Sequence, residues 1–342
     1  MGFLDNIFRL FRDQLFTTPP PLVRADLSGK TVLVVGANVG LGFEAAKHFA
    51  EMQPERLILA CRSETKGQEA INLIKEQTGF QAELWLLDLA KFSSVRKFAD
   101  RWEKEGGRLD ILVENAAVSG FEYNQTEDGW ETMLHVNYLA SALHALLLLP
   151  HMIETAKKYS TTPRLVTVSS GTNHWIQFDK EILGSSSILK SLNSYDPALA
   201  SSSTRSMRGR YPLTKLLNIF FTRALNDRLS TSHPTIITNA VDPAFCHSLL
   251  RRDIRSFGIS LVEFIFAFPT EVGSRQLVFG AIGEDEKLRG GYVSFSKVVE
   301  PNEFISTGEG REAQERLWRE TIDVFQKLDP RVQNIVRDHL SN

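Results

Sequence analysis

Cysteine is scarce, net charge is small, and long apolar runs are absent from this 342-residue chain. Cys61 and Cys246 are too few for a disulfide framework, and neither stands in a metal-ligand spacing, so we expect no metal site. A formal net charge of -2 argues against a nucleic-acid-binding surface, which is usually strongly basic. The longest apolar candidate, residues 140–149, contains Ser141 and His144 and is shorter than the about 18 residues of a membrane span. These shortages predict a cytoplasmic protein with reduced thiols and no transmembrane segment.

The first residues of the chain have an amphipathic pattern. Apolar side chains recur there at helical spacing, with charged residues between them: Leu4, Ile7, Phe8, Phe11 and Leu15. The pattern predicts a helix over residues 2–16, and the three prolines at 19–21 then predict a stiff connector that completes an N-terminal segment, 1–27. Two readings stay open for this helix. It packs on the protein's own surface, or it makes a peripheral membrane contact, which usually needs a more basic polar face.

From residue 30 onward, apolar runs alternate with amphipathic stretches. Buried parallel strands are predicted at residues 31–35, 56–60, 83–87, 110–113, 164–168 and 235–241, and helices at 40–51, 64–77, 92–104, 128–151 and 211–229. This alternation predicts an α/β fold with one doubly wound parallel sheet and helices on both faces. We expect a single domain over 28–300, with a serine-rich insertion of no clear period at 171–209. A helical extension is predicted at 301–342.

A glycine-rich turn, Gly36-Ala-Asn-Val-Gly-Leu-Gly42, follows the first predicted strand and opens the next helix. Glycine permits a sharp turn and a close backbone approach to a pyrophosphate, and a helix N-terminus offers free N–H groups. The turn therefore indicates a dinucleotide site, with a ligand-free tight turn as the alternative. Its candidate contacts are Gly36, Asn38, Gly40, Leu41 and Gly42.

The end of the second predicted strand distinguishes NAD from NADP. An acidic residue there binds the free ribose 2′-OH of NAD, whereas an arginine accommodates the 2′-phosphate of NADP. Arg62 stands at this point and no acid occurs before Glu64, so NADP(H) is the predicted cofactor. Asp88, after the third predicted strand, is a candidate for contacting the adenine or for capping the next helix.

Tyr211 and Lys215 are four residues apart, one helical turn, so their side chains project from the same face. An ammonium near a phenol favours the phenolate and lowers the pKa of the phenol. The pair is therefore suited to general acid catalysis near neutral pH.

Together these residues resemble the classical short-chain dehydrogenase/reductase family over about residues 28–300. The family's G-x-x-x-G-x-G is matched by the glycine-rich turn. Its Asn-Asn-Ala-Gly is matched in part by Glu114-Asn-Ala-Ala117, and its Pro-Gly by Pro243-Ala244, which adds Asn115 and Pro243 as cofactor contacts. The chain is most similar to the retinol-dehydrogenase-like branch and to reductases of fungal secondary metabolism. The resemblance implies a Rossmann-type fold.

The resemblance also assigns catalytic roles. Tyr211 would give a proton to a carbonyl oxygen as hydride arrives from the nicotinamide, and Ser170, after the fifth strand, would hold that oxygen. Lys215 would bind the nicotinamide ribose and lower the pKa of Tyr211, and Asn137 would position a water that returns the proton. Like Tyr211, Lys215 would also contact the cofactor.

Four positions depart from the family pattern, and their effect on cofactor binding stays open: Val35, Glu114, Ala117 and Ala244. Val35 replaces a threonine, Glu114 an asparagine, and the two alanines replace glycines. The segment between Ser170 and Tyr211 is longer than usual in the family. We therefore expect it beside the active site, where it would shape the substrate pocket.

The combined reading is an NADP-dependent oxidoreductase that interconverts a ketone or aldehyde with an alcohol on a fairly large apolar molecule. The family carries its substrate lid where this chain has the apolar segment 246–268, although core packing would also explain that composition. A secondary-metabolite substrate follows only by analogy with the branch. Two alternatives stay open, a non-redox cyclase or isomerase and a cofactor-sensing protein on the same fold. A homodimer through the helices of Asn137 and Tyr211 is also left open.

Overall fold

The computed structural model describes residues 14, 17–196, 198, 202, 204–233, 235–247, 250, 266–284 and 286–340. Apart from Gln14, the predicted helix over 2–16 lies outside the described residues. Most of the apolar segment 246–268 lies outside them too, so the predicted membrane contact and substrate lid stay predictions.

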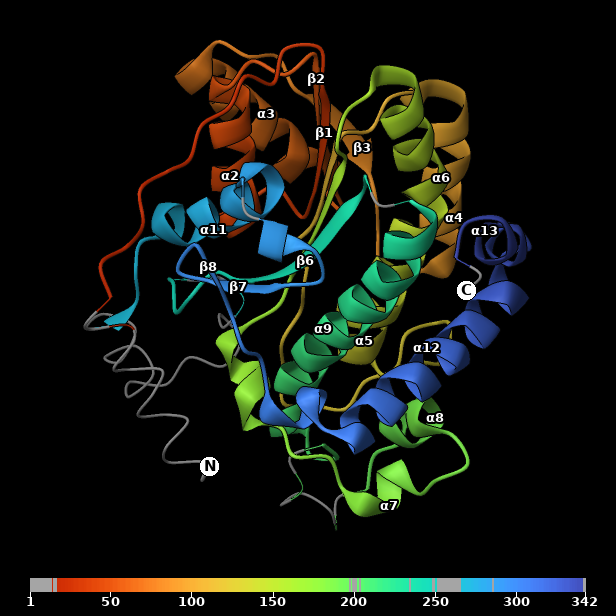
Figure 1. Cartoon of the computed structure of the whole chain (residues 1–342). Coiled ribbons are helices and arrows are strands. Elements are labelled where there is room, and N and C mark those ends of the chain that lie inside the picture. The colour runs from red at the N-terminus through yellow and green to blue at the C-terminus, as the bar shows by residue number, and fades with distance from the viewer. Residues whose placement is uncertain are drawn as a thin grey trace.

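One sheet of eight strands forms the centre of the molecule, with helices on both faces (Figure 1). The strand order is β3-β2-β1-β4-β5-β6-β7-β8, and all neighbours are parallel except the antiparallel pair β7–β8. The strands are β1 (Thr31–Val35), β2 (Arg56–Cys61), β3 (Glu83–Leu86), β4 (Ile111–Glu114), β5 (Arg164–Val168), β6 (Ile237–Asp242), β7 (Tyr292–Ser294) and β8 (Lys297–Val299). The predicted α/β fold with a Rossmann-type, doubly wound parallel sheet is confirmed. The short strands β7 and β8 extend it beyond the six predicted strands.

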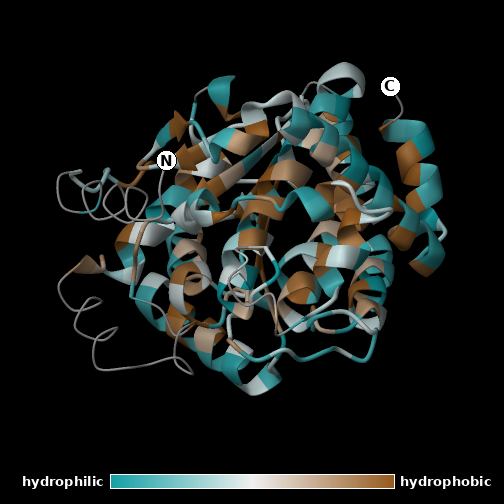
Figure 2. Cartoon of the chain, turned by 90° about the horizontal axis from the view of Figure 1, so that it is seen from below, coloured by the Kyte–Doolittle hydropathy of each residue, from teal (hydrophilic) through white to brown (hydrophobic). Residues whose placement is uncertain are grey.

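Two apolar cores lie on opposite faces of the sheet. Alternate residues of β1 enter different cores, with Val32 and Val34 in one and Leu33 and Val35 in the other. This explains why the strand reads as a continuous apolar run, since both of its faces are buried. Apolar residues, brown in Figure 2, gather in the strands and on the inner faces of the helices.

The helices divide between these two cores. One face carries α2 (Gly40–Glu51), α3 (Glu64–Thr78) and α11 (Thr270–Ile282). The other carries α4 (Phe92–Arg101), α6 (Ser141–Tyr159), α9 (Met207–Ser232), α12 (Gly308–Leu328) and α13 (Arg331–His339). Short helical turns complete the description: η1 (Trp102–Gly106), α5 (Thr132–Leu134), η2 (His135–Ala140), η3 (Gly171–Trp175), α7 (Lys180–Leu183), α8 (Ile188–Asn193), η6 (Glu286–Leu288) and η7 (Glu303–Ser306).

The long helix predicted at 128–151 begins later and ends later than expected. It runs through α5, a π-helical turn at η2, and α6. The combined helix Thr132–Tyr159 is long and apolar enough to cross a membrane by length and composition, but 94% of its most apolar window is buried inside the protein. A core helix explains the same composition. The π-helical turn contains Asn137, and such turns often occur at functional sites.

The insertion 171–209 contains helices that are held by the C-terminal part of the chain. Glu320 of α12 accepts hydrogen bonds from the Ile188 and Leu189 N–H groups, at 3.0 and 2.7 Å, and thereby caps α8. Phe325 and Val332 are fully buried in the core that contains α6 and α9. The predicted extension at 301–342 therefore shares a core with the dehydrogenase-like part of the chain.

Candidate active site

The carboxyl ends of the central strands meet at one edge of the sheet. Strand register aligns Val35 of β1 with Glu114 of β4, and Glu114 with Thr167 of β5. The glycine-rich turn, Asn115 and Ser170 therefore follow their strands at the same edge. From β1 the chain adds strands first on one side of the sheet (β2, β3) and then, from β4 onward, on the other side. Open α/β sheets bind ligands at the point where this direction changes, here between β1 and β4.

The glycine-rich turn has the geometry that the sequence predicted. Gly36 and Gly40 have φ of +75° and +68°, values that favour glycine. A Cβ on Gly42 would lie 2.4 Å from the Gly36 carbonyl oxygen, so a side chain there would force the turn open. Asn115 Nδ2 donates to the carbonyl oxygens of Val35 and Gly36, at 3.1 Å each, and fixes the turn to β4.

The same turn fits an anionic ligand. It leads from β1 through Asn38 into α2, whose first turn includes Gly40, Leu41 and Gly42. The N-cap residue Val39 makes no side-chain capping bond, so the first N–H groups of α2 are left for water or a phosphate.

Arg62 and Asp88 lie at the edge formed by β2 and β3. Arg62 directly follows β2 and its side chain is exposed. Asp88 Oδ1 accepts from the Ala90 N–H at 3.1 Å, and its own N–H donates to Ser94 Oγ at 2.9 Å. The start of α4 is capped by Asp128 instead, since Phe92 N–H donates to Asp128 Oδ2 at 2.9 Å. Asp88 thus holds the turn before α4, and within the described residues its Oδ2 makes no hydrogen bond.

Of the two serines that follow β5, the structure favours Ser170 as the one that faces the site. Ser169 is buried and donates to the Lys215 carbonyl oxygen at 2.8 Å. Ser170 is partly exposed, and its Oγ accepts from the Thr172 N–H and hydroxyl at 3.3 and 3.1 Å. The Ser170 hydroxyl proton therefore remains available to another acceptor.

Lys215 is held beneath Tyr211 on α9. Its Nζ donates to the Val168 carbonyl oxygen at 2.7 Å and lies 5.5 Å from the centre of the Tyr211 ring. Burial lowers the pKa of Lys215 to about 7. The nitrogen is thus fixed close to the phenol, and its charge is sensitive to anything bound beside it.

Asn137 joins the loop after β4 to α9. Its Oδ1 accepts from the Val118 N–H at 2.7 Å, and its Nδ2 donates to the Val118 carbonyl oxygen at 2.9 Å. Nδ2 also donates to Thr214 Oγ1 at 3.1 Å. Both amide protons are used inside the protein, and the water-positioning role of Asn137 stays a prediction.

Glu114 is satisfied by partners that sequence reasoning missed. Its Oε1 lies 2.5 Å from His144 Nδ1, and Oε2 accepts from Ser141 Oγ at 3.1 Å. All three groups are buried. The signal was present in the sequence, because Ser141 and His144 are the two polar interruptions of the apolar run 140–149. The acid points toward α6 rather than toward the nucleotide edge.

The two alanines that replace glycines differ in backbone conformation. Ala117 is not among the positive-φ residues, whereas Ala244 has φ of +64°. Asp242, at the end of β6, accepts from the Ala244 N–H at 3.1 Å and from Ser294 Oγ at 3.1 Å. Pro243 lies buried within this turn, and its carbonyl accepts from Cys246 Sγ at 3.2 Å. The turn therefore has the backbone conformation usual for glycine, and the backbone of Ala244 is strained.

The chain has relatives of known family. A family model described as short chain dehydrogenase matches residues 30–178. The short chain dehydrogenase/reductase dmxR8 of Cryptosporiopsis sp. is 35% identical over 336 residues, covering 97% of this chain and 99% of that protein. The short-chain dehydrogenase/reductase phmF of Phaeosphaeria nodorum is 34% identical over 318 residues, covering 90% of each.

Solved structures support the fold. The L-sorbose reductase of Gluconobacter frateurii, crystallised with NADPH and L-sorbose, matches with a TM-score of 0.58 and 18% identity. The match covers 80% of this chain and 100% of the reductase. At this identity the likeness concerns the fold alone.

Proposed function

This chain belongs to the short-chain dehydrogenase/reductase family, and from that premise we propose that it is an NADPH-dependent oxidoreductase. It would interconvert a ketone or aldehyde and an alcohol on a fairly large apolar small molecule. The observation that carries the proposal is the grouping of Tyr211 and a buried Lys215 on α9, beside the end of β5 that carries Ser170.

The proposed chemistry uses three side chains in reduction. The nicotinamide supplies a hydride to the carbonyl carbon when it is bound. The Tyr211 phenol gives its proton to the carbonyl oxygen, so that the product is the alcohol. Ser170 donates a hydrogen bond to the same oxygen and stabilises the charge that develops there. The Lys215 ammonium favours the phenolate that Tyr211 leaves behind.

The preference for NADP(H) rests on Arg62. Its side chain is exposed at the end of β2, and no acidic residue stands at that position to bind the ribose 2′-OH of NAD. A guanidinium makes strong bidentate hydrogen bonds to phosphate, and NADH lacks the 2′-phosphate that would accept them. Among proteins of the same fold, the L-sorbose reductase was crystallised with NADPH.

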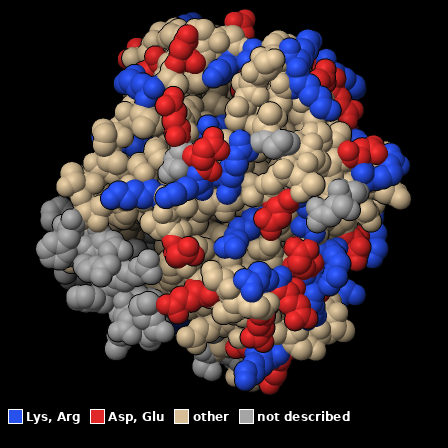
Figure 3. Space-filling view, viewed as in Figure 1, with Lys and Arg blue, Asp and Glu red and all other residues tan. Residues whose placement is uncertain are grey.

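The substrate class is inferred from the insertion and from the relatives. The insertion 171–209 connects Ser170 to the helix of Tyr211, which favours a position beside the substrate site. Both sequence relatives described above are fungal, and the branch resemblance favours a secondary metabolite as substrate. Basic and acidic side chains intermingle on the face shown in Figure 3, so this face offers no continuous basic surface to a polyanion. A cytoplasmic location and a homodimer remain predictions.

Fluorescence titration of NADPH and NADH tests the cofactor. We expect NADPH to bind at least tenfold more tightly, and Arg62→Ala to weaken NADPH about tenfold or more while leaving NADH within about twofold. Arg319→Ala on α12, also an exposed arginine, is the matched control and should change neither affinity. Equal affinity for the two nucleotides in the natural protein would contradict the NADP preference. Binding of neither would favour the non-redox alternatives.

A further inference from the structure

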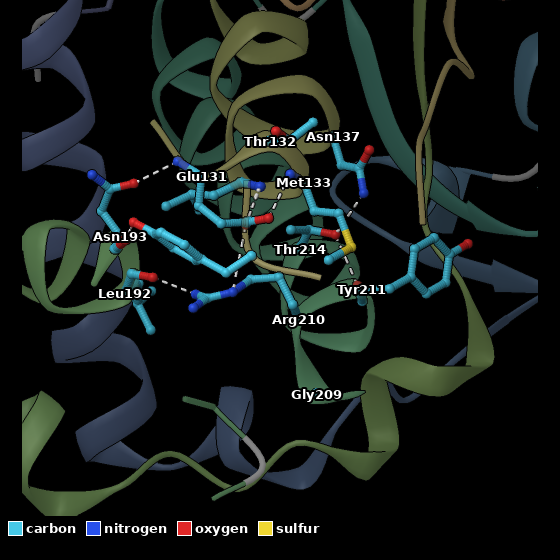
Figure 4. A network of polar contacts seen from close by, with 12 residues as sticks. Glu131, Thr132, Met133, Asn137, Leu192, Asn193, Gly209, Arg210, Tyr211 and Thr214 are labelled. Carbon is cyan, nitrogen blue, oxygen red and sulfur yellow. Dashed lines mark hydrogen bonds and ion pairs between the residues drawn. The ribbon is translucent and has the colours of Figure 1, made fainter. Parts of the chain in front are cut away.

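A buried ion pair lies on the opposite side of α9 from the Tyr211 ring (Figure 4). Arg210 and Glu131 are both fully buried, and Arg210 Nε lies 3.5 Å from Glu131 Oε2. A buried charge is costly unless it is paired and hydrogen-bonded. The guanidinium meets this requirement by donating also to the carbonyl oxygens of Leu192 and Ser194.

Each member of the pair is attached to an element that carries a proposed catalytic residue. The Glu131 carboxylate accepts from the Met133 and Leu134 N–H groups at 2.9 Å each, and so caps the helix that reaches Asn137. Arg210 immediately precedes Tyr211 in the first turn of α9. The ion pair therefore joins the starts of two helices that are distant in sequence.

The insertion is fastened to the same pair. Asn193, the last residue of α8, accepts from the Glu131 N–H at 2.7 Å and donates to the Gly129 carbonyl oxygen at 3.2 Å. With the two carbonyls that Arg210 binds, residues 192–194 contact both members of the pair. A change in the insertion thus reaches both helices through direct hydrogen bonds.

The contacts form a closed ring through the site. The ring runs from Glu131 along its helix to Asn137, across the 3.1 Å hydrogen bond to Thr214, and back along α9 to Arg210. The two helices are thus joined at two points, by the Glu131–Arg210 ion pair and by the Asn137–Thr214 hydrogen bond. We therefore expect that neither helix rotates near Tyr211 without the other. The planar guanidinium reaches Glu131 and the two carbonyl oxygens through three different nitrogens, whereas a lysine ammonium would have to reach all of them from one atom.

We propose that Glu131 and Arg210 are positioning residues that couple the insertion 171–209 to the two helices carrying Asn137 and Tyr211. The proposal rests on the proposed function, since it concerns the placement of the proton donor. Their hydrogen bonds and ion pair within the described residues involve neither the glycine-rich turn nor Arg62, so we expect them to act on the reacting end of the site and to leave the nucleotide end unchanged.

Hydrogen–deuterium exchange of the purified full chain tests the coupling without substrate. Arg210→Met should raise exchange in three segments together: 133–137, 188–194 and 207–215. Arg205→Met is the matched control. Arg205 lies in the insertion close to Arg210 in sequence, but it pairs with Glu181 at 2.9 Å and Asp179 at 3.3 Å. The control should leave 133–137 and 207–215 unchanged. A rise confined to 188–194 in Arg210→Met would overturn the proposal.

Kinetics with NADPH and the apolar ketone acetonaphthone provide the second test. Misplacement by about 1 Å lowers rates roughly 100-fold, so Arg210→Met should lower kcat about 10- to 100-fold with NADPH affinity within twofold. Arg210→Lys and Glu131→Gln, which are milder changes, should fall between this variant and the natural protein. A folded Arg210→Met with unchanged kcat would overturn the proposal. If Arg210→Met fails to fold, the two milder variants decide the question in both assays.

The two proposals fail in different ways. If the natural protein does not reduce the ketone, the proposed function loses support while the exchange measurement still decides the coupling. If the natural protein reduces the ketone and the exchange rise stays local, the function stands and the coupling is wrong.

Discussion

Ala244 provides a test of how this chain adapts the family's site, because its backbone suits glycine. Its φ of +64° places an alanine in the left-handed region, where the Cβ meets the following carbonyl oxygen. That conformation costs an L-residue about 1–2 kcal/mol. Replacing Ala244 by glycine removes this strain, but glycine loses about 0.5–1 kcal/mol more conformational entropy on folding.

The balance favours Ala244→Gly by about 0–1.5 kcal/mol in the free energy of unfolding. The hydrogen bond from the residue 244 N–H to Asp242 Oδ1 has a main-chain donor and therefore survives the substitution. For a chain of this length the melting temperature should rise by only about 1 °C, so equilibrium unfolding in urea is the better assay.

Ala117→Gly is the matched control, because it also restores a family glycine. Ala117 is not in the positive-φ region, so the substitution adds only unfolded-state entropy and should cost about 0.4–1 kcal/mol. The two variants are therefore expected to shift stability in opposite directions. Shifts of the same sign, or destabilisation by Ala244→Gly, would refute the reasoning from backbone strain.

Two further predictions concern buried ionisable groups. Glu114→Asn restores the family residue but should cost about 1–3 kcal/mol in urea unfolding, because His144 and Ser141 lose their buried acceptor; an unchanged free energy would show that this cluster contributes nothing. For Lys215, burial lowers the pKa from 10.5 to about 7, so between these pH values the unfolded chain binds a proton that the folded chain does not. Stability should therefore fall by about 1 kcal/mol per pH unit as pH decreases from about 10 toward 7, level off below 7, and lose this dependence in Lys215→Met.

The features predicted correctly from sequence are those written in consecutive residues. Buried parallel strands such as β1 need apolar side chains on both faces, and that requirement produces a continuous run. The turn at Gly36 and Gly40 needs positive φ, which glycine marks directly. Both signals are local, so no partner has to be known.

The features that sequence could not supply depend on partners far along the chain. The first two N–H groups of α8 are bound by Glu320, and Arg210 is paired with Glu131, so neither sequence neighbourhood reveals the partner. The serine-rich composition of the insertion consequently gave no helical period. The π-helical turn likewise contains Asn137, whose side chain bonds to Val118 and Thr214, and these partners are distant in sequence.

The central claim is that Tyr211 donates the proton in an NADPH-dependent carbonyl reduction. NADPH oxidation with acetonaphthone, compared between the natural protein and Tyr211→Phe, tests it most directly. We expect the variant to lose about 10²- to 10⁴-fold in turnover while its NADPH affinity stays within twofold. Tyr195→Phe, which removes a surface phenol of the insertion, should keep the natural rate. A Tyr211→Phe variant that binds NADPH normally and reduces the ketone at the natural rate would contradict the account.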